Sequence, residues 1–188
     1  AESIQAKLIQ ISTDDVFSSA SDTPYNEFDD VNPVGLFAKS KYAGEKFVIQ
    51  LMTRYVIIRS SWIYGIGKDF LNEILEAATD PKVSTMELWN NDCAVPTSAA
   101  ELARVVKFFI DNDHYGIYHA VCSGGSCTRL EFAREILRLA GKEDQLTVTV
   151  KEGAPEKYSV LDNMMLRLNG IEEPSGWRET LASYMKET

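Results

Sequence analysis

The sequence is poor in cysteine and in long apolar runs, and each shortage excludes a class of protein. Three cysteines in 188 residues are too few and too irregularly spaced for a disulfide framework, and their odd number leaves one thiol unpaired. No apolar stretch approaches the roughly 20 residues of a membrane span, and no basic start leads into a signal-like core. These shortages predict a cytoplasmic protein without a membrane partner.

Positive charge is scarce as well. The chain carries 19 lysines and arginines against 28 aspartates and glutamates, a net charge of -9. Such an acidic surface repels nucleic acid and anionic lipid, so we expect neither as a partner. Cys122 and Cys127 lie near His119, but no second ligand pair follows at the spacing of structural zinc, and we expect no metal.

A further absence concerns the element that holds a dinucleotide. Rossmann-like proteins bind its diphosphate with a strand, a glycine-rich turn and a helix N-terminus. Gly65 and Gly67 follow an expected strand but lack the third glycine and the helix start, and Gly124 with Gly125 is equally incomplete. We therefore expect that this chain alone binds no NADPH in the usual way.

What is present is the alternation of strands and helices that is typical of an α/β fold. Apolar periodicity and turn residues predict strands at residues 7–11, 55–59, 85–88, 116–120 and 146–150, and helices within residues 34–53, 70–78, 98–110, 129–140 and 177–185. Thr97 is expected as an N-cap, Thr128 and Glu131 as a capping box, and Gly141 as a helix end. The first strand, helix and strand predict a parallel sheet.

Several ordered motifs share one family pattern. They are residues 11–17 (ISTDDVF), 32–33 (NP), 39–41 (KSK) with 44–45 (GE), 59–65 (RSSWIYG), 96–97 (PT) with 101–103 (ELA), 116–119 (GIYH), 131–133 (EFA) and 158–163 (YSVLDN). Together they resemble dTDP-4-dehydrorhamnose reductase, of the extended short-chain dehydrogenase/reductase superfamily. The resemblance starts midway through the usual Rossmann domain, so we expect the C-terminal portion of such a protein, without its glycine-rich half.

The resemblance implies three catalytic positions. They are Thr13, Phe37 at the position of the family tyrosine, and Lys41, which in the family also contacts the cofactor NADPH. In a Tyr-x-x-x-Lys pair the lysine lowers the phenol pKa, so that the hydroxyl can give a proton to the substrate. A phenyl ring has no such proton. Thr13 and Lys41 also have plain structural interpretations, as a strand-end hydroxyl and a solvated helix lysine.

Tyr42 and Lys46 repeat the Tyr-x-x-x-Lys spacing as a bare pattern. The shift of five residues turns this pair by roughly 140° from Phe37 and Lys41, so we favour a half-buried structural tyrosine. Other departures from the family lie at Asp15, where it usually reads Tyr, and at Pro155 with Glu156, where it carries Arg-Pro. The last change removes a bidentate phosphate donor and adds a like charge.

Trp62, Tyr64 and Thr97 are the expected substrate-binding residues. Trp62 and Tyr64 come just after the end of a strand, where α/β sheets bind ligands, and their rings could stack on a sugar or base. Core packing is an equally good interpretation of both rings. We expect Arg59 to pair with a carboxylate rather than with substrate, and His119 to be a satisfied, semi-buried histidine.

These expectations give a partial Rossmann-like parallel sheet with a small C-terminal substrate lobe. Residues 1–65, with 97–120 contributing, form the Rossmann-like remnant, and residues 66–96 and 121–188 form the substrate-binding lobe. The resemblance implies NADPH-dependent reduction of a 4-keto nucleotide sugar, but the losses at Phe37 and the glycine loop predict a chain that is inactive as it stands.

The alternative function is a noncatalytic module that binds a nucleotide sugar or regulates a partner, similar to the regulatory subunit of methionine adenosyltransferase. The strand that starts at Lys7 and ends at Ile11 would be an open sheet edge, and such edges invite pairing. We therefore expect a homodimer or a partner chain that covers this edge.

Overall fold

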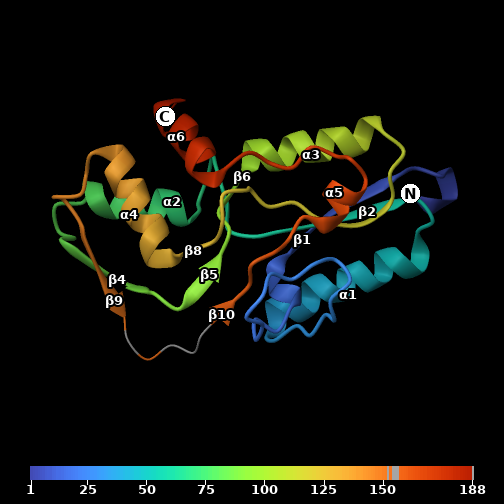
Figure 1. The fold of residues 1–188 in the computed structure, drawn as a ribbon, viewed down its shortest axis with the longest axis horizontal. Coiled ribbons are helices and arrows are strands. Elements are labelled where there is room, and N and C mark those ends of the chain that lie inside the picture. Colours follow the sequence, from blue (N-terminus) through green and yellow to red (C-terminus); the bar gives the residue numbers. More distant parts are fainter. Residues whose placement is uncertain (152, 154–156, 188) are drawn as a thin grey trace.

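The computed structural model describes residues 1–151, 153 and 157–187 (Figure 1). The changes noted at Pro155 and Glu156 lie outside the described residues. The expected α/β fold is confirmed, with parallel strands packed between helices. None of the helices in the described ranges is long and apolar enough to cross a membrane.

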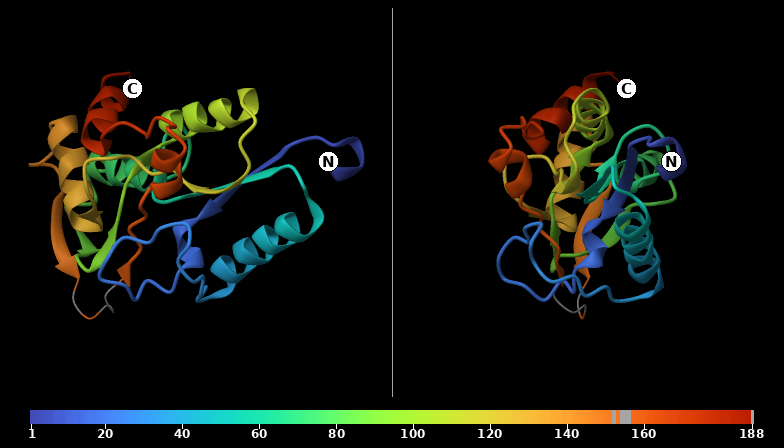
Figure 2. Two further views of the ribbon diagram at one scale, coloured as in Figure 1. Left: turned by 45° about the vertical axis from the view of Figure 1, so that its right-hand side comes forward. Right: turned by 90° about the vertical axis from the view of Figure 1, so that its right-hand side faces the viewer.

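The main sheet has the order β1-β2-β7, and all of its pairs are parallel. Its strands are β1 (Leu8–Thr13), β2 (Tyr55–Ser60) and β7 (Gly116–His119). Helices α1 (Leu36–Leu51) and α3 (Ala99–Asp111) lie on opposite sides of this sheet (Figure 2). The buried side chains of β2, such as Val56 and Ile58, pack against Leu102, Val105 and Phe109 of α3. This packing explains the continuous apolar run of β2, because both faces of the strand are covered.

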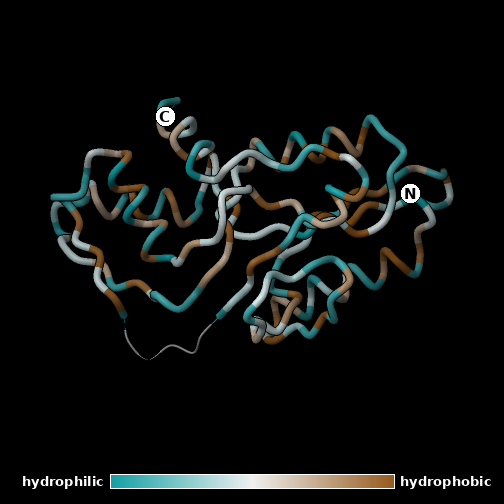
Figure 3. Tube along the Cα trace, in the orientation of Figure 1, coloured by the Kyte–Doolittle hydropathy of each residue, from teal (hydrophilic) through white to brown (hydrophobic). Residues whose placement is uncertain are grey.

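A second core lies in the C-terminal part of the molecule. It gathers apolar faces of α2 (Phe70–Thr79), α4 (Arg129–Ala140) and α6 (Trp177–Glu187), whose polar faces point outward, and Figure 3 shows this alternation along the helices. Beside it run β4 (Thr85–Trp89), paired with β9 (Thr147–Lys151), and the short pair β3 (Ile63–Tyr64) and β6 (Thr97–Ser98). The two cores do not coincide with the two expected parts, because the second core includes Val16, Phe17 and Tyr25, and the core of the main sheet includes Leu166 and Ile171. The division into a Rossmann-like part and a substrate-binding lobe stays a prediction.

A small mixed sheet connects the C-terminal part of the molecule to the end of β1. Its order is β10-β5-β8, made of β5 (Asp92–Ala94), β8 (Cys127–Thr128) and β10 (Lys157–Tyr158). The short helix α5 (Met164–Leu168) then packs beside β7, and 3-10 turns lie at Glu2–Ile4 and Asp14–Val16. The sequence patterns did not predict β5, β8 or β10, because strands of two or three residues show no periodicity.

The helix ends follow their local chemistry. The capping box of Thr128 and Glu131 is confirmed, and Gly141 ends α4 in the left-handed conformation at φ 63°. The N-cap of α3 is a correction: Ser98 accepts from the Ala100 amide, whereas the expected cap, Thr97, lies in β6. Thr97 instead accepts from the Cys122 amide inside the core, at 3.4 Å.

Candidate functional site

A polar pocket of about 330 Å³ lies at the carboxyl ends of β1 and β2. Three of the residues expected to be catalytic meet there: Thr13 ends β1, and Phe37 and Lys41 come from the first turns of α1. Trp62 lines the same pocket just after β2. Parallel strands place their carboxyl ends at one edge of a sheet, which is why residues distant in the chain gather here.

Phe37 and Lys41 present different chemistry to the pocket. Phe37 is 61% exposed, so nothing in the core holds its ring, and a phenyl ring carries no hydroxyl. Lys41, one helical turn on, donates from Nζ to the Ile11 carbonyl at 2.8 Å. This bond ties α1 to the end of β1. Tyr42 packs against the second core instead of lining the pocket, with the Lys46 ammonium 5.1 Å from its ring centroid.

Thr13 is the hydroxyl at the floor of the pocket. Its Oγ1 lies 3.0 Å from Asp14 Oδ1 and 3.2 Å from Asp15 Oδ2, and it accepts the Asp15 amide at 3.2 Å. Asp15 also pairs with Lys157 of β10, with Oδ1 and Nζ 3.0 Å apart. The β1 end is therefore joined to the C-terminal part through a carboxylate and an ammonium.

Asp14 is a buried carboxyl of the pocket, and its pKa is raised. It is only 4% exposed, and burial, with the negative charge of Asp15 beside it, raises the pKa of its carboxyl to about 6. The Ser159 hydroxyl, the Lys157 charge and the Thr13 hydroxyl act in the opposite direction but are weaker. Near neutral pH this carboxyl is therefore close to its own titration point.

Arg129 and Trp62 form the opposite wall. The Arg129 guanidinium lies 3.7 Å from the Trp62 ring centroid, a cation-π distance, and its Nε is 3.7 Å from Asp92 Oδ2. Burial lowers the pKa of Arg129, and Asp92 offsets part of this. Trp62 also stacks on Phe132 and takes a left-handed φ of 41°, which is uncommon for a residue with a side chain. The ring thus serves both the core and the pocket.

Tyr64 and Thr97 lie outside this pocket. The Tyr64 ring is buried against Phe132, and its hydroxyl is 2.9 Å from the Thr180 hydroxyl. Thr97 is fully buried. Their contact with substrate stays a prediction. Sequence reasoning missed Asp14, Arg129 and Lys157 as pocket residues, and only the Asp15 departure from the family pattern pointed to altered charge here.

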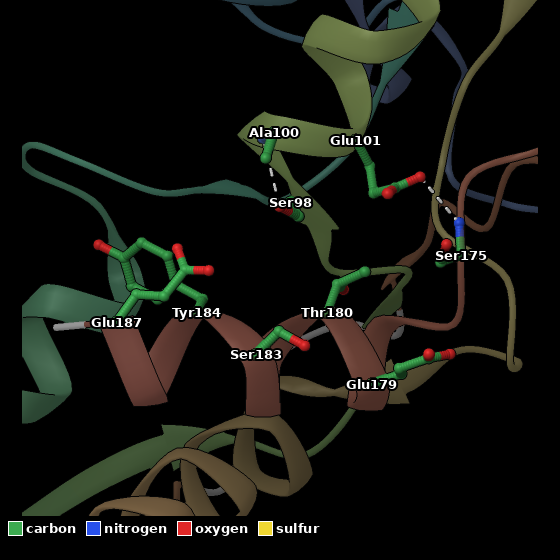
Figure 4. A pocket seen from close by; sticks show the side chains of 9 residues that line it. All are labelled: Ser98, Ala100, Glu101, Ser175, Glu179, Thr180, Ser183, Tyr184 and Glu187. Atoms are coloured by element: carbon green, nitrogen blue, oxygen red, sulfur yellow. Dashed lines mark hydrogen bonds between the residues drawn. The ribbon is translucent and has the colours of Figure 1, made fainter.

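A second pocket lies between the start of α3 and one face of α6 (Figure 4). Its volume is about 220 Å³, and it is lined by three carboxylates, five hydroxyls and one alanine: Glu101, Glu179, Glu187, Ser98, Ser175, Thr180, Ser183, Tyr184 and Ala100. Several of these groups serve the fold, because Ser98 caps α3 and Glu101 accepts from the Ser175 amide at 3.0 Å. With no basic lining residue, it is a poor place for an anionic ligand.

The N-terminus of α2, the helix after β3, is one place where a dinucleotide diphosphate could bind. Gly65 and Gly67 precede α2, but its N-terminus is already taken by the Asp69 carboxylate, which accepts from the amides of Gly65 and Asn72 at 2.8 and 2.9 Å. Ser98 and Thr128 likewise cap α3 and α4. An acidic side chain stands at the start of each of these three helices, namely Asp69, Glu101 and Glu131, and it repels a diphosphate, so these helix starts do not fit that group.

Comparison with known proteins gives one consistent result. The family model described as RmlD substrate binding domain matches residues 1–188. Among curated proteins, the spore coat polysaccharide biosynthesis protein SpsK of Bacillus subtilis is 35% identical over 98% of this chain and 65% of its own length. The dTDP-4-dehydrorhamnose reductase of Mycobacterium tuberculosis is 29% identical over 96% of this chain and 62% of its own.

Solved structures agree. A dTDP-4-dehydrorhamnose reductase from Clostridium acetobutylicum matches with a TM-score of 0.90 and 37% identity, over 98% of this chain and 67% of that one. The Bacillus anthracis enzyme, solved in complex with NADP, matches with a TM-score of 0.92 and 33% identity, over 100% and 67%. The chain thus spans about two thirds of the length of these relatives.

Proposed function

The chain belongs to the RmlD substrate binding domain family, and on this premise we propose that the pocket at the ends of β1 and β2 binds a nucleotide sugar. The carrying observation is the wall formed by Arg129 and Trp62, a cation stacked on an aromatic ring at 3.7 Å. A guanidinium suits a phosphate, and the indole beside it offers apolar surface to a sugar or base. Relatives named as dTDP-4-dehydrorhamnose reductases support a dTDP-linked 4-keto sugar as the ligand.

Local charge supports the same ligand. The chain has a net charge of -9, yet Lys41, Arg129 and Lys157 line this pocket against Asp14 and Asp15. Asp14 sheds part of its charge near neutral pH, because burial raises its pKa to about 6. The pocket therefore offers an anion an environment that most of the acidic surface does not.

We propose further that this chain by itself does not carry out the reduction. A nicotinamide cofactor would supply the hydride, and Lys41 is the pocket residue that could meet its ribose. The capped starts of α2, α3 and α4 do not fit its diphosphate, and Phe37 has no proton to give. Losing a general acid alone costs roughly 100- to 10,000-fold in rate.

Calorimetry with dTDP-4-keto-6-deoxy-D-glucose and, separately, with NADPH tests these proposals. We expect binding of the sugar nucleotide and none of NADPH. Arg129→Met should weaken sugar-nucleotide binding about tenfold or more, since charge-assisted contacts contribute about 1.5–3 kcal/mol. Arg138→Met is the matched control, because Arg138 lies on the same helix, outside the pocket, and pairs with Glu135 at the surface. No heat with the sugar nucleotide would refute the binding proposal, and hydride transfer from NADPH would refute the claim of inactivity.

The second candidate is a noncatalytic interaction module, similar to the regulatory subunit of methionine adenosyltransferase. The order β1-β2-β7 favours it, because β1 has a neighbour on one side only among the described strands. Apolar side chains lie beside that edge: Ile11 comes from β1, and Val106 and Ile110 come from α3. A homodimer or a partner chain on this edge, and a cytoplasmic location in keeping with three free thiols, stay predictions.

A further inference from the structure

Phe37 removes the usual proton donor from the pocket, but a second candidate lies on its floor. Asp14 is 4% exposed, and its Oδ1 is 3.0 Å from Oγ1 of Thr13, which lines the pocket. We propose that Asp14 is the proton source of this site and passes its proton through the Thr13 hydroxyl to the carbonyl oxygen of a bound keto sugar. This role rests on the proposed function, because it needs a keto sugar in the pocket.

The pairing of charges singles out Asp14. Three carboxylates and two cations meet at the pocket: Asp15 pairs with Lys157 at 3.0 Å, and Asp92 lies 3.7 Å from Arg129. Asp14 is left without a cation of its own among the described residues. It faces the negative charge of Asp15 and the more distant positive charges of Lys157 and Arg129. A buried carboxyl in this position takes up a proton instead.

The Thr13 hydroxyl is suited to transmit that proton. Oγ1 lies at the end of β1 and donates to Asp14 Oδ1 at 3.0 Å while it accepts the Asp15 amide. When Asp14 is protonated this bond can reverse, so that the carboxyl donates to Oγ1 and the hydroxyl hydrogen is free to meet a ligand in the pocket. As Thr13 gives its proton to the carbonyl oxygen of the ligand, it receives one from Asp14. Asp14 then recovers a proton from solvent.

Protonation of the carbonyl can be followed without any hydride. When the oxygen gains a proton, the C=O π electrons move onto it, and a hydrogen on the adjacent carbon leaves to water as a proton. Its C–H electron pair forms the C=C bond of an enol, and the reverse path returns the ketone. The cycle is redox-neutral, and in D₂O it replaces hydrogens beside the carbonyl with deuterium.

The experiment measures this exchange by NMR, with dTDP-4-keto-6-deoxy-D-glucose and the full chain in D₂O. We expect the wild type to exchange at least tenfold faster than Asp14→Asn, which keeps the shape of the side chain but cannot release a proton. The wild-type rate should fall as pH rises through about 6, and Asp14→Asn should lose that dependence. Asp144→Asn, at an exposed aspartate outside the pocket, is the control and should leave rate and pH profile unchanged.

Two variants of Thr13 distinguish a loss of proton transfer from a loss of folding. Thr13→Val should lose the exchange as Asp14→Asn does, and Thr13→Ser should keep it. If the wild type and Asp14→Asn both bind the sugar nucleotide and exchange hydrogen at equal rates, Asp14 is not the proton source, and the binding proposal stands. Should Asp14→Asn fail to fold, equal rates for Thr13→Val and Thr13→Ser would overturn the relay. Absence of any sugar-nucleotide binding would overturn both proposals together.

Discussion

Arg59 and Glu45 form a fully buried ion pair that joins β2 to α1. Nη2 of Arg59 lies 2.8 Å from Oε2 of Glu45, and Nε lies 3.1 Å from Oε1. The hydroxyl of Ser12, on β1, also donates to this carboxylate. The pair confirms the expectation that Arg59 meets a carboxylate, and it fixes how α1 lies along the sheet, and with it Phe37 and Lys41 at the pocket.

Removing the carboxylate of this pair should destabilise the fold strongly. Glu45→Gln leaves the Arg59 charge buried without compensation, and the free energy of unfolding should fall by roughly 3–5 kcal/mol. Urea unfolding measures the loss. Glu135→Gln is the matched control: Glu135 pairs with Arg138 on an exposed helix face, and its loss should cost less than about 1 kcal/mol. Equal losses in the two variants would contradict the structural role of Glu45.

Asp14 should make the stability depend on pH. Its pKa is raised from 3.8 to about 6 in the folded chain, so the native state holds an extra proton between these values. Stability from this group is therefore present below about pH 3.8 and is lost as pH rises to about 6, by about 3 kcal/mol in all. In urea unfolding, the free energy of unfolding of Asp14→Asn should rise by that amount relative to the wild type between acid and neutral pH. A constant difference between the two proteins would count against the raised pKa.

His119 should stay neutral through mild acid. It is fully buried, and burial, with the Arg59 charge nearby, lowers the pKa of its imidazole from 6.5 to about 3. Because the unfolded chain binds the proton more readily, stability from this group is lost as pH falls from about 6.5 toward 3. Long-range ¹⁵N–¹H NMR should show a neutral His119 ring at about pH 4.5. A charged ring at that pH would refute the assignment.

Phe37→Tyr should return a proton donor to the pocket. Lys41 lies one helical turn away and would lower the pKa of the new phenol, so carbonyl-linked hydrogen exchange should rise by about 10- to 100-fold. Phe47→Tyr is a close control, because Phe47 lies on the same helix and is 62% exposed, against 61% for Phe37. A rise in both variants, or in neither, would show that position 37 has no place in the chemistry.

The free edge of β1 should be covered in solution. Light scattering is expected to give a dimer for the chain alone, and amides on the open side of β1 should exchange slowly with solvent. Ile110 lies beside the edge with Ile11 and Val106 and is 65% exposed. The variant Ile110→Glu places a charge on this apolar surface and should shift the dimer toward monomer. A monomer with freely exchanging β1 amides would rule out pairing between copies of this chain.

Long elements with clear boundary chemistry could be predicted from the sequence. The α4 helix shows this best, because the Thr128 hydroxyl, the Glu131 carboxylate and Gly141 each satisfy a local requirement. Thr97 was wrong as an N-cap because two adjacent hydroxyl residues compete for that role, and only the pairing of β3 with β6 places Ser98 as the cap. Local sequence cannot decide between such neighbours.

The pocket could be predicted only in part. Thr13, Phe37, Lys41 and Trp62 belong to recognisable motifs and do come together. Arg129 and Lys157 enter the pocket from α4 and β10, and this arrangement depends on the parallel pairing of β5 with β10 and the antiparallel pairing of β5 with β8. Strands of two residues leave no pattern in a sequence, so neither residue could be expected there.

The ion pair of Asp15 and Lys157 also bears on how the protein is made. The two residues are 142 positions apart, and the main sheet joins segments from the first 60 residues to β7. Contacts so distant in the chain form late and slowly, because long loops must close first. A nascent chain on the ribosome therefore exposes the floor of the pocket, with its aspartates unpaired, until β10 has emerged.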